Sequence, residues 1–206
     1  MRCFVALLPT FEVAQALQEL AQAAAERFGG RVTRGDTLHL TLDFLGEVPP
    51  ERLPAVEDAC AAAANAPALA SGFDLCLDRL ACWRHKHLLW AGCRTPPAGL
   101  FPLAEDLRGR LASAIERAPA PAFTPHLTLV RRVIDVGGAT EAACGELLVG
   151  RCPQGIPVWP VRAMALVESR LLANGPEHRV RALYPLGGTC SDASGGVRSP
   201  ARCSKA

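Results

Sequence analysis

"LHLTLDFLG" over residues 38–46 and "PHLTLVRRV" over residues 125–133 are the two stretches from which the fold is best predicted. Two His-x-Thr triplets, each with Leu at the intervening and following positions, exceed what chance supplies in a chain with five His. In a β-strand, successive side chains point to opposite faces. His39 and Thr41 therefore share one face, and the neighbouring leucines face a core. The second stretch repeats this arrangement with His126 and Thr128.

The same order of elements precedes both motifs. A strand over 2–9 and a helix over 10–28 precede the first motif, and a strand over 88–93 and a helix over 95–118 precede the second. Equal order at nearly equal spacing indicates an internal duplication. We expect two similar lobes across a pseudo-twofold axis, with His39 and His126 converging.

Further elements follow from composition and periodicity. We expect a helix over 49–64, strands over 72–83, 87–93, 156–170 and 178–186, and a loop with at most a short helix over 136–150. The Gly- and Ser-rich stretch over 187–206 predicts a disordered tail. The domain is therefore expected to span residues 1–186.

Composition limits the possible classes of protein. Half of the 206 residues are apolar and a fifth are charged, which indicates a folded chain, and the net charge of +2 does not by itself indicate a nucleic-acid partner. The apolar run over 3–8 is too short for a secretory signal or a membrane span. We expect a soluble, cytoplasmic protein. The nine Cys form no CxxC pair, so we expect free thiols and neither a metal nor a cofactor.

Two imidazoles and two hydroxyls in one cleft suit in-line displacement at phosphorus. One imidazole accepts a proton from the attacking group and the other donates one to the departing oxygen, each step typically worth about 10²- to 10⁴-fold. The hydroxyls of Thr41 and Thr128 would donate to non-bridging phosphate oxygens. This chemistry requires no metal. His85, His87 and His178 lack such a pattern and are interpreted as ordinary polar residues or minor substrate contacts.

Two arginines follow the second motif. Strand alternation places residues 126, 128, 130 and 132 on one face, which favours Arg132 in the cleft. A β-bulge or the end of the strand would place Arg131 there instead.

The motifs "LHLTLDFLGEV" and "PHLTLVR", with "RCFVALLP" at the start and "HLLWAGC" between them, resemble the two-histidine (2H) phosphoesterase superfamily. The resemblance is to its RNA 2',3'-cyclic phosphodiesterases, also called 2'-5' RNA ligases, and covers residues 2–186. It implies an α+β, bilobal fold with two pseudo-symmetric antiparallel sheets, helices on the outside and a central cleft. It also implies metal-independent hydrolysis of RNA 2',3'-cyclic phosphate ends to 2'-phosphomonoesters, with reversible 2'-5' ligation as a second reaction.

The resemblance also implies roles for individual residues. His39 would donate a proton to the 3' oxygen, and His126 would be the general base for water. Thr41 and Thr128 carry over as phosphate ligands, and Arg131 matches the basic position that follows the second motif, so we expect Arg131 in the cleft. Phe4 matches an aromatic residue that would stack on the terminal base. A core position for Phe4 is an equal alternative.

Two other functions remain open. The substrate could be a small nucleoside or ADP-ribose cyclic phosphate, which the low net charge favours because long RNA usually needs a basic stripe. The chain could instead bind RNA ends without turnover, although Arg or Lys would serve recognition as well as His. We expect a monomer that acts on such an RNA end or small cyclic nucleotide, without a membrane partner.

Overall fold

The computed structural model describes residues 1–66, 72–118, 122–152, 154–172 and 175–187. The predicted tail lies outside the described residues, apart from Gly187. The strands are β1 (Arg2–Leu7), β2 (Arg31–Val32), β3 (Leu40–Glu47), β4 (Phe73–Leu75), β5 (Arg79–Trp83), β6 (Leu88–Gly92), β7 (Leu127–Arg131), β8 (Trp159–Val161), β9 (Ala163–Leu172) and β10 (Gly175–Pro185). The helices are α1 (Phe11–Phe28), α2 (Leu53–Ala64), α3 (Leu100–Ala114) and α4 (Glu141–Arg151), with 3-10 turns η1 (Gly35–Thr37), η2 (Pro50–Arg52) and η4 (Arg84–Lys86).

The main sheet has two antiparallel halves. Its order among the described residues is β10-β9-β1-β3-β7-β6-β5, with the short β2 beside β7, and β4 and β8 form a separate pair. The halves meet between β3 and β7 at a single residue pair, Leu40 and Leu127. Strand β1 lies between β3 and β9, as β6 lies between β7 and β5. The expected two-lobed α+β fold is confirmed, and the two expected sheets are joined edge to edge as the halves of one eight-stranded sheet of the described chain.

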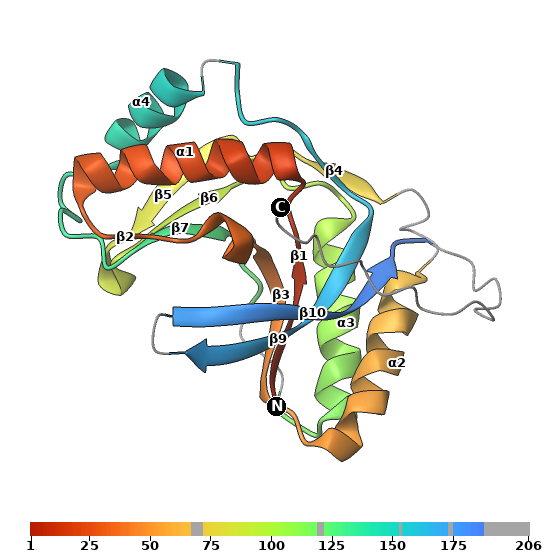
Figure 1. The fold of residues 1–206 in the computed structure, drawn as a ribbon. Coiled ribbons are helices and arrows are strands. Elements are labelled where there is room, and N and C mark those ends of the chain that lie inside the picture. Colours follow the sequence, from red (N-terminus) through yellow and green to blue (C-terminus); the bar gives the residue numbers. More distant parts are fainter. Residues whose placement is uncertain (67–71, 119–121, 153, 173–174, 188–206) are drawn as a thin grey trace, which may run out of the picture.

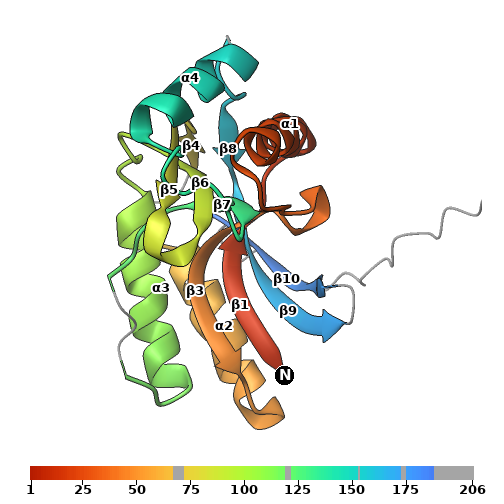
Figure 2. The ribbon, with the colours of Figure 1, turned by 90° about the vertical axis from the view of Figure 1, so that its left-hand side faces the viewer.

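The helices cross between the two halves. Helix α1 follows β1 in sequence but packs on β7 and beside α4, and α3 follows β6 but packs on β3 and beside α2 (Figure 1). Figure 2 shows α2 and α3 together on one side of β1 and β3. Because each half is covered by the helix that belongs to the other repeat, the two repeats share one continuous apolar core.

The leucine faces of both motif strands lie in this core. Leu40 and Leu42 are buried in β3, and Leu127 and Leu129 are buried in β7. Thr41 and the corresponding Thr128 are only half-buried, because they point to the opposite face. The alternation predicted from the sequence therefore determines which side of the sheet carries the polar groups.

Three predicted elements differ from the structure in type or continuity, and the helix predicted over 95–118 is shorter, since α3 spans Leu100–Ala114. The stretch 136–150 contains a full helix, α4, which begins where the Thr140 hydroxyl accepts a hydrogen bond from the Ala143 amide at 3.2 Å. Its glycines weaken the helical signal, and packing of the buried Leu147 compensates. The predicted strand over 72–83 is split into β4 and β5, and the one over 156–170 into β8 and β9. No helix of the described chain is long and apolar enough to cross a membrane.

Candidate active site

Both motif strands carry a β-bulge at the same place. In β3, Thr41 pairs with Ala6 and Asp43 pairs with Val5, so Leu42 is the extra residue. In β7, Thr128 pairs with Trp90 and Val130 pairs with Leu89, which leaves Leu129 as the extra residue. The duplication therefore repeats an irregularity of the backbone as well as a sequence motif.

The bulges change which later residues face the site. Leu129 and Val130 are both buried although they are consecutive, so alternation shifts by one and Arg131 returns to the face of Thr128. Arg131 lines the site cavities, whereas Arg132 lines neither and has a left-handed φ of 55°. The prediction from strand alternation, which placed Arg132 in the cleft, is thus wrong. The family-based expectation for Arg131 agrees with its position.

The bulge in β3 differs from its repeat in one side chain. Asp43 is buried where β7 has Val130, and it forms ion pairs with Arg117 and, at 3.8 Å, with Arg108 of α3. Burial raises the pKa of the Asp43 carboxyl, and both guanidinium groups oppose that rise. These contacts tie the bulge after Thr41 to the helix that covers it.

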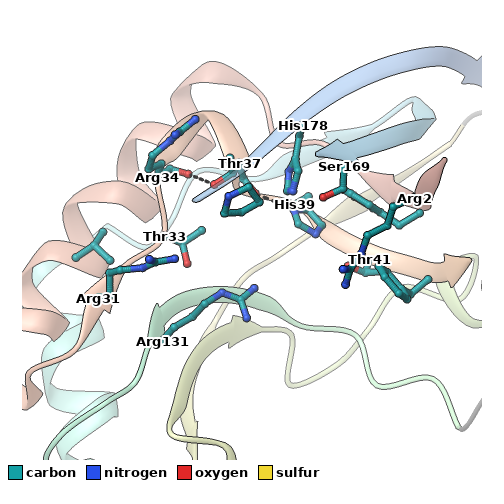
Figure 3. Close-up of a pocket in the computed structure, with 14 residues that line it drawn as sticks. Arg2, Arg31, Thr33, Arg34, Thr37, His39, Thr41, Arg131, Ser169 and His178 are labelled. Atoms are coloured by element: carbon teal, nitrogen blue, oxygen red, sulfur yellow. Dashed lines mark hydrogen bonds between the residues drawn. The ribbon is translucent and has the colours of Figure 1, made fainter. Parts of the chain in front are cut away.

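Two adjoining cavities lie on the polar face of the sheet. The smaller one, about 130 Å³, is lined by Thr33, Thr37, His39, Thr41, Leu88, His126, Thr128 and Arg131. It brings together the predicted histidines, threonines and Arg131. The larger one, about 480 Å³, shares His39, Thr41 and Arg131 with it and extends to Phe4, Arg31 and His178 (Figure 3).

Both motif histidines are held by the same hydrogen bond. The Nδ1 of His39 donates to the carbonyl of Thr37 at 2.7 Å, and the Nδ1 of His126 donates to the carbonyl of Thr124 at 2.8 Å. A carbonyl has no proton to give, so Nδ1 carries the hydrogen in both rings. In the neutral state each Nε2 is therefore a free proton acceptor, with no hydrogen-bond partner among the described residues. Two equivalent bases consequently share one cavity.

Burial shifts both imidazoles toward the neutral form. It lowers the pKa of His39 to about 4, and repulsion from His178, Arg131 and His126 in their protonated forms adds to this effect. Burial also lowers the pKa of His126, helped by Lys86 and Arg131. The hydrogen bonds to the carbonyls oppose both shifts. In the free protein at neutral pH, both rings are therefore neutral.

An aromatic ring packs against the imidazole of each motif histidine. The ring of Phe4 lies 4.7 Å from that of His39 at an interplanar angle of 32°, and only 3% of Phe4 is exposed. Trp83 lies 4.6 Å from His126, centroid to centroid. The face that Phe4 would offer to a base is thus already covered by a histidine. Its structural surroundings correspond to the core alternative, and its base-stacking role stays a prediction.

The sequence did not single out several other cavity residues. His178 of β10 lies edge-to-face against His39 at 5.2 Å and against Phe4 at 5.0 Å, so it belongs to the wall of the large cavity. Thr33 lines both cavities, and its buried hydroxyl has no hydrogen-bond partner among the described residues. No local pattern marks these residues, because strand pairing far along the chain brings them to the site. His87 instead donates from Nδ1 to the Val133 carbonyl at 2.9 Å, outside both cavities.

No group of three His, Cys, Asp or Glu side chains in the described parts of the chain is placed to hold a metal ion. The metal-free mechanism remains a prediction that a chelator tests directly.

Comparison with known proteins identifies the family. The profile of the LigT-like phosphoesterases matches residues 8–90. An RNA 2',3'-cyclic phosphodiesterase of Thermus thermophilus is 32% identical over 197 residues, which cover 91% of this chain and 91% of that protein. This chain is a LigT-like phosphoesterase. The resemblance inferred from the two motifs is thereby confirmed.

Other relatives of this LigT-like phosphoesterase agree. The RNA 2',3'-cyclic phosphodiesterase of Escherichia coli is 42% identical over 103 residues, which cover 50% of this chain and about half, 55%, of that protein. The crystal structure of E. coli LigT complexed with NADP+ has a TM-score of 0.68 at 26% identity and covers 91% of this chain and 98% of that chain. A crystal structure of a Thermus thermophilus protein has a TM-score of 0.69 at 28% identity, covering 91% of this chain and 99% of that chain. The LigT-like fold therefore extends over nearly the whole described chain.

Proposed function

We propose that this protein hydrolyses 2',3'-cyclic phosphate ends of RNA to 2'-phosphomonoesters, with His39 and His126 as the acid and the base. The observation that carries the proposal is the pair of equivalent His-x-Thr bulges on one cavity of about 130 Å³. The relatives named RNA 2',3'-cyclic phosphodiesterase support the choice of substrate.

The reaction needs two proton transfers and one displacement. Nε2 of His126 accepts a proton from water as the water oxygen attacks phosphorus. Nε2 of protonated His39 gives its proton to the 3' oxygen, and the bond between phosphorus and that oxygen breaks. The products are a 2'-phosphomonoester and a 3'-hydroxyl. A 5'-hydroxyl in place of water forms a 2'-5' bond by the same steps.

Thr41, Thr128 and Arg131 hold the phosphate in this scheme. Their hydroxyl and guanidinium groups donate to the non-bridging oxygens, where charge accumulates in the transition state. The anionic phosphate also stabilises an imidazolium, which raises the pKa of His39 from its low value in the free protein. Substrate binding therefore supplies the condition under which His39 becomes the acid.

The test is the product from an oligonucleotide with a 2',3'-cyclic end. We expect a 2'-phosphomonoester, identified by phosphorus NMR, and a rate lowered by about 10²-fold or more in the His39→Asn and His126→Asn variants. A 3'-phosphomonoester would mean that the 2' oxygen departs, and would overturn the assignment. Tight binding of the cyclic end without turnover would establish the RNA-end binding alternative. The cytoplasmic location and the monomeric state stay predictions.

A further inference from the structure

Two arginines on neighbouring strands are directly paired in the wall of the large cavity. Arg31 of β2 pairs directly with Arg131 of β7. Like charges directly opposite on neighbouring strands destabilise a sheet. Neither guanidinium has a carboxylate partner among the described residues, and no Asp or Glu of the described chain lines the cavity. Within the described chain, no carboxylate therefore offsets the repulsion between the two guanidinium groups, although one would be expected if the pair served only to stabilise the fold.

Arg31 lies beside Arg131 because the main chain at Gly30 packs closely against β7. Gly30 has a φ of 112°, and a Cβ on it would lie 2.8 Å from the Val130 side chain and 2.9 Å from the Arg131 carbonyl. Only glycine permits this approach of the chain to β7. The amide of Thr33 then donates to the Leu129 carbonyl at 2.8 Å. The position of Arg31 is thus fixed by its main chain.

A second unpaired group lies beside Arg31. Thr33 is two residues further on, and its buried hydroxyl has no partner in the described part of the chain. A buried polar group without a hydrogen bond costs free energy unless a ligand or water supplies one. By contrast, Arg34 is paired with Asp36 at 2.6 Å, and the Arg2 guanidinium lies over the Phe44 ring. Arg31 and Thr33 can therefore both donate hydrogen bonds to an anion in this part of the cavity.

Arg31 and Arg131 differ in which of the two cavities they line. Arg131 lines both, whereas Arg31 lines only the larger one. Cross-strand neighbours have Cβ atoms about 5 Å apart, and the long side chains add several ångströms of reach, which is the scale of one nucleoside. An anion at Arg31 would therefore lie about one nucleoside away from the phosphate held between the histidines.

We propose that Arg31, with Thr33, binds a second phosphate, attached to the 5' oxygen of the nucleoside whose cyclic phosphate contacts Arg131. This inference rests on the proposed function. The ligand chemistry is a 5'-phosphate group, which either an internucleotide linkage or a free 5'-phosphate supplies. The second phosphate neutralises the like-charged pair, so substrates that carry it bind more tightly than a plain 2',3'-cyclic nucleoside.

The experiment compares three substrates: adenosine 2',3'-cyclic phosphate, its 5'-phosphorylated form, and an adenosine dinucleotide with a 2',3'-cyclic end. Wild-type protein is compared with Arg31→Gln and with Arg132→Gln, a matched control that removes the same charge next to Arg131 but outside both cavities. We expect wild type to favour substrates with a 5'-phosphate by about tenfold in kcat/KM, mainly through KM. Arg31→Gln should abolish that preference and leave the plain cyclic nucleoside unaffected, while Arg132→Gln behaves as wild type.

The outcomes separate the possibilities. A preference for both phosphate-bearing substrates supports recognition of the phosphate itself, and a preference for the dinucleotide alone supports recognition of the internucleotide linkage. If wild type has the same kcat/KM on all three substrates, the inference is overturned and the proposed function stays intact. The same holds if Arg31→Gln loses kcat/KM equally on all three. An equal loss of preference in both variants also overturns it. Absence of turnover with every substrate overturns the proposed function itself. The melting temperature of Arg31→Gln should not fall, because a like-charge contact is removed.

Discussion

Leu42 and Leu129 occupy the same position in two bulged strands, each as the extra residue directly after a His-x-Thr triplet. Each bulge turns the residue two positions later, Phe44 or Arg131, onto the polar face, where both line the large cavity. The repeats thus share backbone geometry but place different chemistry at the equivalent site. An aromatic ring lies on one side and a guanidinium on the other.

Replacing either motif histidine should remove catalysis without unfolding the protein. His39→Asn and His126→Asn are each expected to lower kcat by about 10²-fold or more, because each removes one proton transfer. Steady-state kinetics on a cyclic-ended oligonucleotide measures the change. His87→Asn is the matched control, since His87 has the same kind of carbonyl hydrogen bond outside the cavities. Near-normal kcat in either motif variant would exclude that histidine from the reaction.

The pH dependence should differ between the free protein and the substrate complex. Burial lowers the pKa of both histidines, that of His39 to about 4, so the form with one neutral and one charged ring is most populated on the acidic side. A bell-shaped kcat/KM with its maximum below about pH 6.5 is expected. The bound phosphate raises these pKa values, which moves the maximum of kcat to higher pH. A single sigmoid in kcat/KM would contradict two-histidine catalysis.

A chelator should leave the rate unchanged. The proposed steps use only imidazole, hydroxyl and guanidinium groups, so kcat in excess EDTA is expected to equal that of untreated protein. The control is protein dialysed against buffer with Mg²⁺ or Mn²⁺. Activity that is lost with EDTA and restored by a divalent cation would refute the metal-free mechanism.

Substitution of Phe4 distinguishes its two alternatives. Phe4→Leu removes part of a buried ring and is expected to cost about 1 to 2 kcal/mol of the free energy of unfolding. If Phe4 only supports the His39 ring, kcat falls severalfold and KM stays the same for purine and pyrimidine ends. An increase in KM that is larger for purines would instead show stacking on the base. Thermal unfolding of the variant serves as the control for stability.

Removal of residues 188–206 should leave both stability and activity unchanged. The Gly- and Ser-rich composition of this stretch gives it little apolar surface to bury. Within the described chain, the Gly187 amide donates a hydrogen bond to the Ala64 carbonyl at 2.9 Å. The last residues of the domain proposed to span residues 1–186 are therefore bonded to the end of α2. Comparison of melting temperature and kcat/KM with the full chain is the measurement. A fall in either would assign the stretch a role.

The sequence by itself determined the repeat, the two motif strands and the face on which each histidine lies. These follow from alternation, which is a local property of the chain, so His39, Thr41, His126 and Thr128 could be placed without coordinates. Alternation pointed to Arg132 and the family resemblance to Arg131, and the tertiary structure decided between them, because the bulge that shifts the alternation depends on pairing with β6. The tertiary structure alone also brought Arg31, Thr33 and His178 to the cavity, through β2 and β10. The lowered pKa of His39 likewise arises from burial among elements distant in sequence, which no local pattern encodes.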